Sequence, residues 1–156
     1  MTRKRSKRES KPAWPRARLS IKRMAPYNPP IDGRSGKLRL DFNENTVGCS
    51  PRVVELIKKK ATAKFLSVYP EYEVSRKKIA PFFGVKENQL IFADGTDEAI
   101  QLMAHTYVDP GEEVLIPWPT FPIFRLAAES VGAKLRLARY PLDTLKFPLR
   151  KILRAI

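Results

Sequence analysis

Cysteine and histidine are nearly absent from this chain, with one residue of each among 156. Cys49 therefore has no partner for an internal disulfide, which is typical of a reducing compartment and predicts a cytoplasmic protein. A conventional zinc site needs several cysteine or histidine ligands, so no metal site is expected. The sequence also lacks an apolar run of the ~18–20 residues that a membrane span requires. These absences predict a soluble protein that needs neither a metal nor a disulfide framework.

Acidic residues are also scarce, and 30 Lys and Arg against 16 Asp and Glu give a net charge of +14. Most of the excess lies at the N-terminus, because residues 1–23 contain ten basic residues and one acid and so carry +9. The remaining residues carry only +5. The basicity is therefore mostly a property of a tail, which argues against a nucleic-acid-binding fold.

Residues 1–23 have three interpretations. They form a disordered arm that binds polyanions through counterion release, or an organelle targeting segment, or an extension upstream of a natural start at Met24. The dense like charge of residues 3–8 shows no amphipathic period, which weakens the targeting interpretation. We therefore treat residues 1–23 as a basic, disordered tail.

Helical and strand patterns alternate along the rest of the chain. A helix is expected to begin after Ser50, because Ser is a good N-cap and Pro51 fits the first helical position. Another helix is expected from Glu73 to Phe83. Further patterns predict strands at 90–93, 113–116 and 134–139, helices at 97–107, 122–130 and 148–155, and a short strand at 38–42. This alternation predicts an α/β fold with a mostly parallel sheet flanked by helices.

The most informative stretch is residues 90–100, where Asp94-Gly95 separates an apolar run from a helical pattern. A helix that begins at such a turn has unpaired backbone N–H groups and a partial positive charge, which favour a phosphate. Thr96 and Asp97 can cap the helix while their N–H groups face the anion. A purely structural turn has the same pattern. The loop at 118–121 follows another expected strand, and ligands of α/β folds bind at such strand ends.

Five short motifs occur in order along the chain. They are Asp41-Phe42-Asn43-Glu44-Asn45 with Gly48-Cys49-Ser50-Pro51, Tyr69-Pro70-Glu71, the turn from Ala93 to Ile100, the segment from Asp109 to Pro117, and Pro119-Thr120-Phe121. Over about residues 38–156 the chain resembles the N-terminal portion of the histidinol-phosphate aminotransferase family. These class I/II enzymes have the fold-type I architecture and use pyridoxal 5′-phosphate.

The resemblance implies roles for eight residues. The cofactor phosphate would be held by backbone N–H groups at the turn formed by Gly95, Thr96, Asp97 and Glu98. Phe121 would stack on the pyridine ring, and Tyr69 would cross a dimer interface to the phosphate of the partner subunit's cofactor. Asn43 and Asn45 would border the substrate pocket. Each residue also has a structural interpretation, as part of a capped turn or as a core aromatic.

The chain also departs from the family pattern. Thr46-Val47 stands where many members have Pro-Tyr, which removes a phenol near the substrate and leaves the amino donor open. The family's Schiff-base lysine, its pyridine-binding Asp and its carboxylate-binding Arg have no counterpart in this sequence. We therefore expect no catalytic residue here.

The resemblance implies three segments: the tail at 1–23, an N-terminal arm and helix at 24–68, and a truncated part of the cofactor-binding large domain at 69–156. The leading hypothesis is a fragment of an aminotransferase that is inactive alone and pairs as a homodimer or with a complementing C-terminal half. The family's reaction uses a small amino donor and a keto acid. The alternatives are a non-catalytic basic protein that binds nucleic acid or other polyanions through its tail, and a remnant without activity.

Overall fold

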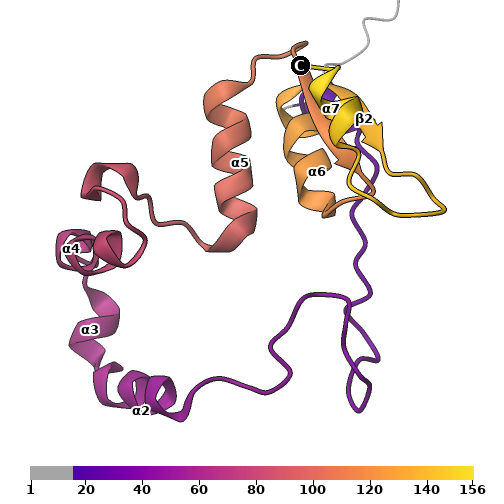
Figure 1. Ribbon diagram of the computed structural model, residues 1–156. Helices are drawn as coiled ribbons and strands as arrows, with labels where there is room; N and C mark the ends of the chain where they lie inside the picture. Colours follow the sequence, from indigo (N-terminus) through magenta and orange to yellow (C-terminus); the bar gives the residue numbers. More distant parts are fainter. Residues whose placement is uncertain (1–15) are drawn as a thin grey trace, which may run out of the picture. The chain divides into compact units, whose positions relative to one another are not determined.

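The computed structural model describes residues 16–156, and the chain divides into two compact units (Figure 1). The first unit combines the N-terminal residues up to Pro26 with Ala93–Ile156, and the second is Tyr27–Phe92. None of the helices in the described part of the chain has the length and apolar character that a membrane crossing requires.

The first unit has alternating helices and strands. Its elements after residue 93 are α5 (Gly95–Tyr107), β1 (Glu113–Trp118), α6 (Pro122–Val131), β2 (Lys134–Arg139) and α7 (Leu149–Leu153). The two strands pair in parallel, from Glu113 opposite Lys134 to Trp118 opposite Arg139. A parallel pair joined by a helix is the βαβ unit, so the α/β prediction is confirmed.

Apolar side chains of α6 and the two strands form the core of the first unit. The buried residues are Ile116, Ile123, Ala127, Ala128, Val131 and Ala138. Pro122 occupies the first position of α6, and Gly132 ends the helix with a φ of +87°. The small alanines let α6 lie close to the sheet, while Gly132 supplies the left-handed conformation that a helix end commonly needs.

Two further helices pack against α6. Helix α5 lies beside it (Figure 1). The short α1 (Leu19–Arg23) also contacts α6, and the Ser20 hydroxyl donates a hydrogen bond of 3.1 Å to the carbonyl of Ser130. The expectation of a disordered tail over residues 1–23 therefore differs from the structure at residues 19–23. Residues 1–15 lie outside the described residues.

The second unit contains α2 (Pro51–Lys60), α3 (Ala63–Ser67), α4 (Tyr72–Phe82) and the 3₁₀ turn η1 (Glu87–Gln89). The expected helix start after Ser50 is confirmed. Pro81 lies in the last turn of α4, and Gly84 follows it with a φ of +65°. Ala80 is the one buried residue among the described residues of this unit.

Two expected strands are wrong. Residues 90–93 and 38–42 have no strand conformation, and the sheet of the described residues consists of β1 and β2 alone. A strand exists only when a neighbour accepts and donates its backbone hydrogen bonds, and neither segment has such a neighbour. Ile91, Leu38 and Leu40 are accordingly exposed.

Candidate functional site

The start of α5 combines a special backbone conformation with open space. Gly95 is the first helical residue and has a φ of +73°, which favours glycine. A Cβ built at this position would meet no atom within 4 Å. The Glu98 carboxylate accepts a hydrogen bond from the N–H of Asp94, whereas the Asp94 side chain makes no capping bond. The Glu98 carboxylate therefore caps the N-terminal end of α5, and the space around the Cα of Gly95 stays open.

Two backbone donors stay free at this helix start. Among residues 16–156, the N–H groups of Thr96 and Asp97 donate to no backbone carbonyl outside α5, and N–H groups of a first helical turn have no acceptor within their own helix. They belong to the first turn of a helix of 13 residues, where the helix dipole adds partial positive charge. Free donors, a glycine and open space are what a phosphate group needs in order to reach the backbone. The start of α5 therefore has the geometry of a helix N-terminus that is open to an anionic group.

Phe121 lies at the start of the neighbouring helix. It is the N-cap residue of α6, and its ring makes an edge-to-face contact with Phe124 at a centroid distance of 6.4 Å. Phe121 is 39% exposed as a residue, which leaves part of its surface available to a ligand. The loop before it begins at Trp118, whose ring lies 5.9 Å from the Arg125 guanidinium.

The starts of α5 and α6 share one end of the first unit. In Figure 1 both helices begin at the lower end of the view, where β1 finishes. The structure thus brings the 95–98 turn and Phe121 to the same end of the unit, although only Phe121 follows a strand there.

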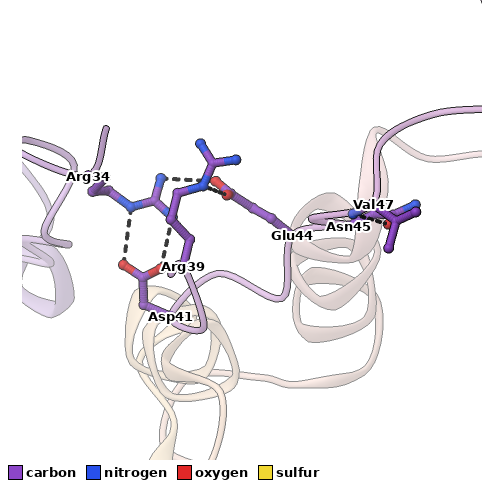
Figure 2. A network of polar contacts seen from close by, with 6 residues as sticks. All are labelled: Arg34, Arg39, Asp41, Glu44, Asn45 and Val47. Atoms are coloured by element: carbon purple, nitrogen blue, oxygen red, sulfur yellow. Dashed lines mark hydrogen bonds and ion pairs between the residues drawn. The ribbon is translucent and has the colours of Figure 1, made fainter. Parts of the chain in front are cut away.

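Asn43 and Asn45 lie in the second unit, in a loop held by ion pairs (Figure 2). Arg34 donates to both carboxylate oxygens of Asp41 at 2.8 and 3.2 Å and to Glu44 Oε1 at 2.9 Å. Arg39 Nε lies 2.8 Å from Glu44 Oε2. The positive charges of two arginines are therefore paired with the negative charges of two carboxylates in the loop around Asn43.

The hydrogen bond from Arg34 has an electrostatic effect on Asp41. It lowers the pKa of Asp41 below its ordinary value of 3.8, while the same bond raises the pKa of Arg34. The Arg34 guanidinium also lies 4.2 Å from the centroid of the Phe42 ring, a cation–π distance. Both ions are thus fixed in their charged forms at neutral pH.

Tyr69 also belongs to the second unit, between α3 and α4. It is 96% exposed, so its hydroxyl is free to meet a ligand or another chain. Its neighbours in an open surface cavity of about 780 Å³ include Lys64 and Phe65.

Sequence reasoning missed Arg34 and the side-chain contact of Glu98, a residue that the resemblance had assigned to the site through its backbone. Arg34 lies seven residues before Asp41 in a segment rich in turns, and no spacing rule indicated the pair. Glu98 was interpreted through its backbone alone, although a Glu four residues after a helix N-cap is close enough to reach back to it. No group of three or more metal-ligating side chains occurs within the described part of the chain.

The fold and the site together define a class: an α/β protein in which an open helix start and an aromatic loop lie at the same end of one unit. Residues 35–156 match the family model for aminotransferase class I and II, and the chain belongs to this family.

The relatives found by sequence are histidinol-phosphate aminotransferases, which confirms the predicted resemblance. The protein from Geobacillus sp. (strain WCH70) is 36% identical over 126 residues, which cover 80% of this chain and 33% of that protein. The protein from Moorella thermoacetica is 33% identical over 130 residues, covering 77% of this chain and 33% of that protein. The chain thus spans about a third of the length of the curated relatives it matches.

A solved structure agrees with the fold. The histidinol-phosphate aminotransferase from Sinorhizobium meliloti in complex with pyridoxal-5′-phosphate matches with a TM-score of 0.70. The match covers 92% of this chain and 40% of that chain at 20% identity, so it supports the fold.

Proposed function

We propose that this chain supplies the cofactor-phosphate site of a pyridoxal-phosphate-dependent aminotransferase similar to the histidinol-phosphate aminotransferases. The observation that carries the proposal is the pair of free N–H groups at Thr96 and Asp97, next to the open space at Gly95. Membership of the aminotransferase class I and II family and the relatives named above support it.

In this proposal the backbone N–H groups of Thr96, Asp97 and Glu98 bind the phosphate and fix the position of the cofactor. Phe121 packs on the pyridine ring and sets its tilt through apolar contact. The bound cofactor supplies an electron sink for amino-group transfer. The chain's own residues orient that cofactor and shield one face of its ring from water.

The remaining site residues have roles at the edges of this site. Tyr69 donates its phenol to the cofactor phosphate of a partner subunit, which makes the working unit a homodimer or a complex with a complementing C-terminal half. Asn43 borders the pocket for a small amino donor, with a phosphorylated amino alcohol such as histidinol phosphate as the first candidate. The exposed Cys49 thiol fits a reducing cytoplasm.

We further propose that the 156-residue chain does not transfer amino groups alone. The lysine clusters at Lys58–Lys60 and Lys77–Lys78 are exposed to solvent on α2 and α4. None of them lies in the desolvated pocket that activates an amine for attack on a carbonyl. Borohydride reduction of the chain mixed with pyridoxal phosphate should leave no cofactor on lysine. A stable reduced adduct on one lysine contradicts this part of the proposal.

Equilibrium binding of pyridoxal phosphate and of pyridoxal to the full chain tests the phosphate site. The variant Thr96→Pro removes one N–H in the first helical turn, where Pro is tolerated. Losing a hydrogen bond to a charged group costs about 1.5–3 kcal/mol, so affinity for pyridoxal phosphate should fall at least about tenfold. Thr96→Ala keeps the N–H and should bind normally. Equal binding of pyridoxal and pyridoxal phosphate contradicts the proposal.

A further inference from the structure

We propose that Arg34 is a positioning residue that holds Asn43 in place for the substrate. The inference rests on the proposed function for the substrate role of Asn43. The contacts of Arg34 with Asp41, Phe42 and Glu44, which we call the Arg34 clamp, lie within the second unit. Arg34 is 19% exposed at its side chain, although it lies in a loop. Its donors contact the residues on both sides of Asn43 in the sequence, as Figure 2 shows.

The clamp acts at a strained position of the backbone. Asn43 has a φ of +53°, a left-handed conformation that asparagine tolerates better than most residues but that still needs support. Asp41 and Glu44 flank this residue, and one guanidinium binds both carboxylates. Since the fork of Arg34 spans the two sides of the turn, Asn43 cannot relax without breaking those bonds.

The Phe42 ring completes the clamp. It lies under the Arg34 guanidinium with the centroid 4.2 Å from Cζ. A planar guanidinium can make the two-carboxylate contact and the ring contact together, whereas a lysine ammonium is a point charge that cannot. Arg34→Lys is therefore not a conservative change at this site.

The two asparagines consequently have different roles. The Asn45 side chain is used within its own turn, where Nδ2 donates to the Gly48 carbonyl at 2.9 Å and Oδ1 accepts from the Val47 N–H at 3.2 Å. The Asn43 side chain has no hydrogen-bond partner among residues 16–156. Asn43 is thus the residue that the clamp presents to a ligand, and Asn45 maintains the loop after it.

The test uses the full ¹⁵N-labelled chain and the variants Arg34→Ala, Arg34→Lys and Arg39→Ala. The order parameter of the Asn43 backbone N–H should be about 0.85 in the parent chain and below about 0.6 in Arg34→Ala. Arg34→Lys should be intermediate. Arg39→Ala is the matched control, because it removes one ion pair to Glu44 and leaves the Arg34 contacts in place. An Asn43 order parameter in Arg34→Ala equal to that of the parent overturns the proposal.

A titration with histidinol phosphate separates this inference from the proposed function. The side-chain amide signal of Asn43 should shift in the parent chain and in Arg39→Ala, and should not shift in Arg34→Ala. If Arg34→Ala loosens the loop while the parent shows no Asn43 shift, the clamp is supported and the substrate role in the proposed function is contradicted. Unchanged amide signals of β1 and α6 establish that each variant is folded. If Arg34→Ala does not fold, Arg34→Lys decides by the same two readouts.

Discussion

The two units of this protein are held together by different kinds of interaction. The first unit buries a continuous apolar set from β1, α6 and β2, including Ile116, Ile123 and Val131. The second buries Ala80 alone among its residues and orders its long loop through the Arg34 clamp, a partly exposed network of charges. Apolar burial supplies most folding free energy, whereas exposed ion pairs contribute little and weaken with salt.

The residues of the candidate site are divided between these two units. The proposed cofactor-phosphate turn and Phe121 belong to the unit with the apolar core. Asn43 belongs to the loop that ion pairs hold, so we expect its order to depend on pH and salt. The comparison therefore predicts that core mutations affect the unit with the proposed phosphate turn, whereas charge mutations affect the loop that contains Asn43.

The largest effect should follow from Ile116→Ala. Ile116 is 3% exposed in the middle of β1, and truncating a buried isoleucine costs about 2–5 kcal/mol of unfolding free energy. Denaturant unfolding of the full chain, followed by hydrogen exchange of β1 amides, measures this loss. Ile91→Ala is the control, because Ile91 is 69% exposed and its loss should cost less than about 0.5 kcal/mol. Equal losses for the two variants would break the comparison.

A smaller effect should follow from Gly132→Ala. Gly132 ends α6 with a φ of +87°, and a Cβ there would lie 3.5 Å from that of Pro110. The contact distance is ordinary, so the cost comes from the left-handed backbone and should be about 1–2 kcal/mol. Gly132→Asn should cost less because asparagine tolerates this conformation. Thermal unfolding of the two variants should rank them in this order, and the reverse ranking contradicts the backbone explanation.

Glu98→Gln should have opposite effects on stability and on phosphate binding. Its carboxylate caps the N-terminal end of α5, and losing an acid there costs about 0.3–1 kcal/mol. The same charge repels a phosphate at the helix start, so affinity for pyridoxal phosphate should rise about fivefold if about 1 kcal/mol of repulsion is removed. Glu87→Gln on the 3₁₀ turn of the other unit is the control and should change neither quantity. Weaker binding in Glu98→Gln would mean that the carboxylate assists the phosphate site.

The smallest effect should be the acid sensitivity of the Asn43 loop. The pKa of Asp41 is lower in the folded chain than its ordinary value of 3.8, because Arg34 hydrogen-bonds its carboxylate. The resulting stabilisation is present above that ordinary value and is lost as the pH falls through the folded pKa. Glu44 and Arg39 also belong to this network, so Asp41→Asn identifies the part due to Asp41. The order parameter of Asn43 against pH measures it, and an identical profile in Asp41→Asn contradicts the assignment.

The local signals in the sequence predicted the elements that are self-contained. The start of α2 at Ser50-Pro51, the end of α6 at Gly132 and the strand at 134–139 follow from capping and periodicity, and the structure has all three. The strand predicted at 90–93 is absent because four apolar residues are compatible with a strand, whereas a strand forms only when it pairs with a neighbour. The Arg34 clamp was missed because it depends on the path of a loop, which no periodicity encodes.

The central claim is that the start of α5 holds the phosphate of pyridoxal phosphate. The most direct measurement is the shift of backbone amide signals in the ¹⁵N-labelled full chain as pyridoxal phosphate is added, with pyridoxal as the phosphate-free comparison. The account predicts that the Thr96 and Asp97 amides shift most, that inorganic phosphate reproduces these shifts, and that pyridoxal does not. Shifts that arise elsewhere, with Thr96 and Asp97 unchanged at saturating pyridoxal phosphate, would contradict it.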